Sequence, residues 1–171
     1  AASSLATPAL AAEASTINAA DTAWMIVATA LVLMMTIPGL ALFYSGMVRK
    51  KNVLATMAQS LAAVAMISIL WVAFGYSLAF VGDGPWIGTL DRWFLIGMTM
   101  ESVNPAAKTI PEALFMLYQM TFAIITVALV AGAVADRMRF SAYLLFSAGW
   151  FMFAYVPLAH WVWGGGFLAT M

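Results

Sequence analysis

The chain has 171 residues, of which 65% are apolar and 8% are charged, whereas a soluble domain carries about 25% charged residues. Seven basic and seven acidic residues balance each other, so no excess of positive charge points to a nucleic acid partner. The absence of cysteine excludes disulfide frameworks, thiolate metal sites and cysteine nucleophiles. These properties predict an all-α fold, a bundle of helices that crosses a membrane several times.

The first 20 residues differ from the rest, because they are small, lean towards polar types and include the acid Glu13. The Ala-x-Ala pattern at Ala9 to Ala11 resembles the end of a signal peptide, with cleavage before Ala12. A flexible extracytoplasmic tail is the alternative. Either interpretation leaves residues 21–171 as the membrane domain.

Four segments without charge predict membrane spans, at about residues 22–48, 53–81, 113–135 and 140–158. The first would be roughly 40 Å long as a helix, which exceeds a hydrocarbon core of about 30 Å. Pro38 lies inside it and predicts a kink. The fourth leads through Pro157 into Gly164–Gly166, and a break in regular helix at membrane depth is a candidate lining for a site.

The charged residues predict the orientation of these spans. Five of the seven basic residues lie in two short turns, at 49–52 and 136–139, while six of the seven acids lie elsewhere. Short loops rich in Lys and Arg stay in the cytoplasm, so the N-terminus is expected outside. The segment 82–112 is then an outer loop, for which we expect a short surface helix over 91–98.

The spans offer little reactive chemistry, since no Asp, Glu, Lys or Arg lies inside them and a single histidine assembles no catalytic or metal site. We therefore predict no enzyme, no metal and no cofactor. Tyr118, Phe122, Ile125 and Leu129 follow helical spacing and share one helix face. With Trp163 they predict an aromatic cup for a small cation, because ring faces bind cations. Ordinary helix packing is the alternative.

Motifs in five regions of the chain resemble one family in the right order. They are TIPGLALFYSG at 36–46 followed by VR and KNV up to residue 53, ILWVAFGYSLAF at 69–80, QMTF at 119–122 with ITV at 125–127, ADRMRFS at 135–141, and YVPLAHWVWGGG at 155–166. The family is that of the Amt, Mep and Rh ammonium transporters. The resemblance runs from about Asp21 to the last residue.

The resemblance implies the first four spans of an eleven-span, inverted-repeat fold, which forms a homotrimer with one pore in each subunit. By position, Phe122 matches the ring that gates the pore, Trp163 the indole over the external ammonium site, and Tyr118 a second aromatic beside the gate. The implied substrate is ammonium, which loses a proton and crosses past two histidines. The implied setting is the inner (plasma) membrane, with a PII-type regulatory protein on the cytoplasmic face.

Some family residues have no counterpart up to Met171, namely a recruiting serine, an acid after the glycine run and the two pore histidines. The resemblance therefore implies that these 171 residues alone do not conduct. His160 belongs to the outer end of the fourth span, and we expect an interfacial histidine bonded to backbone or water. Trp163 together with Phe122 favours the Amt type over Rh gas channels. An ammonium-sensing receptor with a signalling domain, and a non-transporting membrane module, remain as alternatives.

Overall fold

The computed structural model describes residues 17–135, 137–169 and 171, so the signal-like pattern at Ala9 to Ala11 lies outside the described residues. Four helical segments of the described chain are long and apolar enough to cross a membrane: Ala19–Met47, Lys50–Phe80, Glu112–Val134 and Phe140–Trp163. The predicted all-helical membrane bundle is confirmed. The fourth segment continues to Trp163, whereas the sequence placed its end at Leu158.

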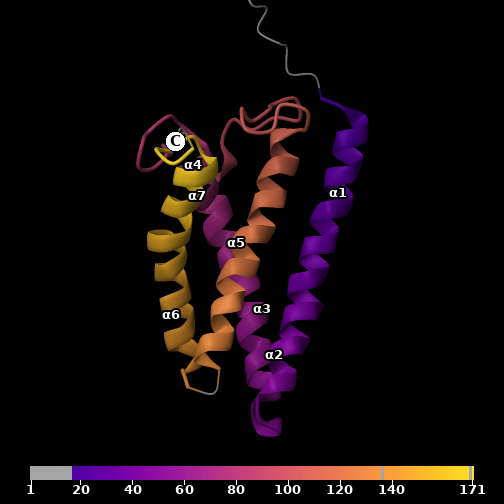
Figure 1. Ribbon diagram of the computed structural model, residues 1–171, viewed down its shortest axis with the longest axis vertical. Coiled ribbons are helices and arrows are strands. Elements are labelled where there is room, and N and C mark those ends of the chain that lie inside the picture. Colours follow the sequence, from indigo (N-terminus) through magenta and orange to yellow (C-terminus); the bar gives the residue numbers. More distant parts are fainter. Residues whose placement is uncertain (1–16, 136, 170) are drawn as a thin grey trace, which may run out of the picture.

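The helical segments subdivide into elements that pack around a central pair. In chain order these are α1 (Ala19–Met34), η1 (Met35–Leu40), α2 (Ala41–Met47), η2 (Lys50–Asn52), α3 (Val53–Leu70), η3 (Trp71–Gly75), α4 (Tyr76–Phe80), η4 (Trp93–Leu95), α5 (Glu112–Val134), α6 (Phe140–Trp150), η5 (Phe151–Tyr155) and α7 (Val156–Trp163). Helices α3 and α5 pack together, α1 lies against α5, and α6 lies against α3 (Figure 1).

The two ends of the bundle are different (Figure 1). At one end, here called the loop end, α1 begins, α7 finishes and the long connection from α4 to α5 folds over the helices. At the other, the turn end, short connections join α2 to α3 and α5 to α6. The basic segments at 49–52 and 137–139 therefore share one end of the molecule.

Three of the four spans contain a π-helical segment. The segment η1 holds Pro38, where the sequence predicted a kink, and the proline supplies no backbone donor to the helix. The other two, η3 and η5, were not predicted. The expected break at Pro157 is wrong, because this proline occupies the first turn of α7, directly after η5, and the helix continues past it to Trp163.

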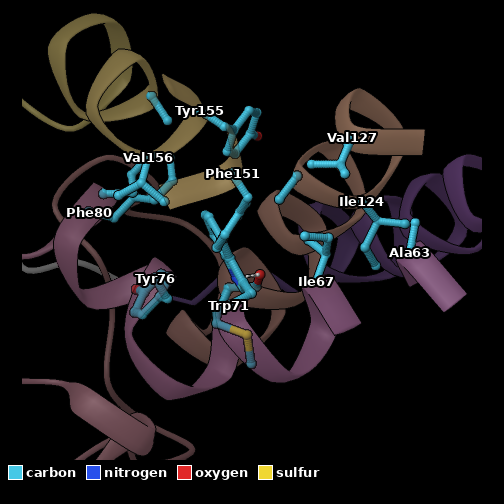
Figure 2. Close-up of a cluster of buried hydrophobic side chains, with 14 of the residues drawn as sticks. Ala63, Ile67, Trp71, Tyr76, Phe80, Ile124, Val127, Phe151, Tyr155 and Val156 are labelled. Carbon is cyan, nitrogen blue, oxygen red and sulfur yellow. Dashed lines mark hydrogen bonds between the residues drawn. The ribbon is translucent and has the colours of Figure 1, made fainter. Parts of the chain in front are cut away.

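The core joins the second and fourth spans where η3 and η5 lie side by side (Figure 2). Trp71 is fully buried there, and its indole nitrogen donates to the carbonyl of Met116 across 3.2 Å. Its ring meets Phe151 and Tyr155 edge to face, with centroids 6.3 Å apart in each pair. A Cβ at Gly75 would lie 2.7 Å from the Phe151 ring, so this glycine permits the close approach.

The connection between α4 and α5 is mostly irregular. The surface helix expected over 91–98 is wrong, since only the 3₁₀ turn η4 forms there. Phe94 and Leu95 have φ values of 47° and 59°, in the left-handed region that an α-helix cannot contain. Backbone hydrogen bonds from Gly88 to Leu78 (2.8 Å) and from Thr89 to Val81 (2.8 Å) hold the connection against the end of α4.

Candidate aromatic site

Tyr118, Phe122 and Trp163, the three residues named from the sequence, line one pocket at the loop end. The pocket has a volume of about 320 Å³. Its remaining lining comes from α4, α5 and the long connection: Phe80, Ala106, Phe115 and Gln119. We call this cavity the aromatic pocket. Five of its seven side chains are aromatic, so a small guest would meet mainly ring surfaces.

Helix α5 presents two of these rings. Tyr118 and Phe122 are one helical turn apart, and their rings meet edge to face with centroids 5.0 Å apart at 72°. Both side chains are half-buried. Ile125 and Leu129 continue the same helix face, but the aromatic pocket ends above them, and Leu129 is exposed. Of the four residues predicted to share this helix face, Tyr118 and Phe122 therefore line the aromatic pocket, whereas Ile125 and Leu129 lie outside it.

Trp163 is the last residue of α7 and stands at the rim of the aromatic pocket, with 58% of its surface exposed. Gly164 ends the helix, and its backbone nitrogen donates to the carbonyls of Ala159 (3.1 Å) and His160 (2.9 Å). A Cβ at Gly164 would overlap the carbonyl oxygen of Ala79 at the end of α4. The backbone that carries Trp163 is therefore packed directly against the second span.

His160 connects α7 to the second span. Its Nδ1 lies 3.0 Å from the carbonyl of Ala79, and its Nε2 lies 2.5 Å from the carbonyl of Gly84. A carbonyl oxygen only accepts and a neutral imidazole carries one N–H, so the tautomer decides which of the two carbonyls receives the hydrogen bond. The prediction of a histidine bonded to backbone is confirmed, and the side chain is fully buried.

A second cavity of about 460 Å³ adjoins the aromatic pocket, and Phe80, Ala106 and Trp163 line both. We call it the polar pocket, after the side chains that distinguish it: Asp83, Arg92, Asn104 and Glu112. This group was not predicted from the sequence, because all four residues belong to the segment 82–112, which was expected to be an outer loop. Their opposite charges in a chain with few charges were the available signal.

The geometry suits the capture of a small cation. Each ring face contributes about 0.5–2 kcal/mol of cation–π attraction, more where water is excluded. Among residues 17–135, 137–169 and 171, no three His, Asp or Glu side chains gather as metal ligands would. Four membrane-length helices with an aromatic pocket at one end define a polytopic helical membrane protein.

Comparisons with known proteins identify the family. The model of the Ammonium Transporter Family matches residues 23–171. The chain is 49% identical over 158 residues to a putative ammonium transporter of Methanothermobacter thermautotrophicus, covering 91% of this chain. It is 50% identical over 151 residues to an ammonium transporter of Bacillus subtilis, covering 88% of this chain. The chain belongs to the Ammonium Transporter Family, which comprises transporters and not enzymes.

Solved structures agree with this assignment. The crystal structure of Candida albicans Mep2 superposes with a TM-score of 0.79 at 36% identity and covers 91% of this chain. Saccharomyces cerevisiae Mep2 gives a TM-score of 0.72 at 32% identity. The chain spans 34% of each of these two proteins. It spans 38% and 37% of the two microbial relatives. The resemblance to the N-terminal part of the ammonium transporters is confirmed.

Proposed function

We propose that the complete protein moves ammonium or ammonia across the membrane, and that Tyr118, Phe122 and Trp163 form its recruitment site and gate. The observation that carries this proposal is the aromatic pocket itself, in which all three rings line one cavity. Family membership, and relatives that are named as ammonium transporters, support the substrate.

The rings stand in a sequence that a cation entering from the loop end would follow. Trp163 is the most exposed of the three and meets the cation first, while it still holds part of its water. Tyr118 follows, and Phe122 lies one helical turn further along α5. Because Phe122 is apolar, it keeps hydrated ions from passing beyond the aromatic pocket. Ammonium that passes this ring leaves its water behind, and this desolvation favours the neutral form, with the proton passing to the water outside the ring.

The orientation and assembly belong to the same proposal. The basic residues of both short turns share the turn end (Figure 1), which by the positive-inside rule faces the cytoplasm. The N-terminus and the aromatic pocket then face outward from the inner (plasma) membrane. We further propose a homotrimer, and a PII-type regulatory protein that binds at the turn end.

Uptake measurements on the product of the complete gene test the proposal. Phe122→Ala and Trp163→Leu should each lower ammonium or methylammonium uptake in cells at equal amounts of membrane-inserted protein. Phe153→Ala and Trp93→Leu are matched controls, since these exposed rings lie outside the aromatic pocket. Unchanged uptake in both pocket variants would refute the proposed site.

A further inference from the structure

The loop end holds a buried charge that the proposed pathway does not use. Glu112 is the first residue of α5 and is 3% exposed. The hydroxyl of Tyr76 donates to its Oε1 across 3.0 Å. The guanidinium of Arg92 lies 3.3 Å from its Oε2. The backbone nitrogen of Glu112 donates to the carbonyl of Ser102 across 2.7 Å, so both the main chain and the side chain of Glu112 have partners.

The partners of Glu112 tie three segments together. Tyr76 begins α4, directly after the π segment η3. Asn104, in the long connection, donates to the Tyr76 hydroxyl (2.9 Å) and to the carbonyl of Phe80 (3.3 Å). The backbone of Arg92 donates to Ser77 Oγ across 3.0 Å. We call Tyr76, Arg92, Asn104 and Glu112 the Glu112 network; it joins α4, the connection and α5 at one point.

The aromatic pocket lies one helical turn away from this point. Phe80 follows Tyr76 by one turn of α4, and Phe115 follows Glu112 by one turn of α5. The two rings meet edge to face with centroids 5.1 Å apart at 82°, and both line the aromatic pocket. A shift of Glu112 relative to Tyr76 would therefore move one wall of the pocket against the other.

Stability alone does not explain a buried ion pair here. The cost of removing two charges from water offsets most of their attraction, and an apolar contact would hold the helices as well. Hydrogen bonds to a carboxylate are directional, however, so the Tyr76 bond to Oε1, with Arg92 paired at Oε2, favours one arrangement of the segments. The carboxylate also lies at the N-terminus of α5, where the helix dipole favours negative charge.

We propose that Glu112 is a positioning residue for cation recruitment: through Arg92 and Tyr76 it sets the register of α5 against α4, and so the spacing of the rings in the aromatic pocket. This inference rests on the function proposed above. Glu112 acts through its neighbours, and the cation itself binds at the rings. Removing the charge should weaken capture of the cation more than it changes the maximal rate.

The test compares KM and maximal rate for methylammonium uptake by the complete protein in proteoliposomes. Glu112→Gln retains the size of the side chain and an acceptor for Tyr76 but removes the charge facing Arg92. We expect KM to rise roughly tenfold, as for one lost charge-assisted contact, with the maximal rate per inserted transporter nearly unchanged. Arg92→Gln should give a similar rise, and the double variant should add little, because both changes break the same pair.

Glu101→Gln is the matched control, since it removes the same charge from an exposed position in the same connection, and its KM should stay at the wild-type value. If Glu112→Gln fails to insert, Tyr76→Phe removes only one donor and should raise KM by a smaller factor. A wild-type KM in Glu112→Gln, or in Tyr76→Phe where that variant replaces it, would overturn the inference. Reduced uptake in Phe122→Ala and Trp163→Leu beside that result would leave the proposed function standing.

Discussion

The ring of Tyr44 lies directly against Gly132, where α2 and α5 meet near the turn end. The Tyr44 hydroxyl donates to the carbonyl of Leu129 across 3.0 Å. A Cβ at Gly132 would lie 2.5 Å from the edge of the Tyr44 ring. Gly132 thus serves the packing of two helices within one chain.

Gly132→Ala should destabilise the protein by about 1–3 kcal/mol, because the added methyl forces the Tyr44 ring aside. The measurement is the midpoint of thermal unfolding of the detergent-solubilised protein. Gly149→Ala is the matched control, since nothing lies within 4 Å of the Cβ position at this helical glycine. Gly149→Ala should leave the stability of the protein unchanged or raise it by up to about 1 kcal/mol, because alanine is more favourable than glycine inside a helix. Equal midpoints for the two variants would contradict the packing described.

Gly164→Ala should displace Trp163 from the rim of the aromatic pocket. The added Cβ would overlap the carbonyl of Ala79 and approach His160 Nδ1 to 2.8 Å, and a backbone carbonyl cannot move aside as a side chain can. Methylammonium uptake by the complete protein should fall. Gly46→Ala provides a control, because its Cβ position is open. Normal uptake by Gly164→Ala would show that the contact does not position the indole.

His160→Ala should destabilise the loop end by about 1–3 kcal/mol, since the carbonyl that accepts from the imidazole loses its donor and the fully buried ring leaves a cavity. Hydrogen exchange, followed by mass spectrometry, should become faster in the segment around Gly84 and at the end of α4. His160→Gln keeps a donor and should give an intermediate effect. If instead exchange is unchanged while uptake is abolished, His160 takes part in transport directly and is not a structural connector.

The proposed orientation predicts which side of the membrane each connection faces. The 171 residues contain no cysteine, so single replacements can be labelled there with an impermeant thiol reagent. Leu90→Cys, in the exposed long connection, should react in intact cells, and Lys51→Cys only after permeabilisation. The parent protein serves as background. The opposite pattern would place the turn end outside.

The number of spans could be predicted because long uncharged apolar segments have few alternatives to membrane helices. The π segments η3 and η5 could not. No residue type marks Trp71–Gly75, and its shape depends on how closely Gly75 approaches Phe151, which is a tertiary contact. The prediction of a surface helix over 91–98 was wrong for a similar reason. Arg92 pairs with Glu112, a tertiary contact, and Phe94 then takes a positive φ that an α-helix cannot contain.

The rings of the candidate site were found from motifs, and helical spacing correctly placed Tyr118 and Phe122 on one face. The neighbouring polar group was missed, since a charged residue in a connection is normally solvated. Only the fold brings Arg92 and Asn104 together with Tyr76, which belongs to a different span. Sequence separation conceals such a group unless the topology is already known.

The π segments η3 and η5 each have the effect of a one-residue insertion that leaves the helix unbroken. Tyr76 and Val156 donate to carbonyls five positions earlier, at Trp71 and Phe151, so everything beyond is turned by about 100° relative to an uninterrupted α-helix. A helical wheel drawn through the whole span would therefore assign the wrong face to its final turns. Tyr143 precedes η5 and Trp163 follows it, so the direction of the Trp163 side chain does not follow from the helix face on which Tyr143 packs. A substitution that re-aims the indole need not disturb the helix contacts below it.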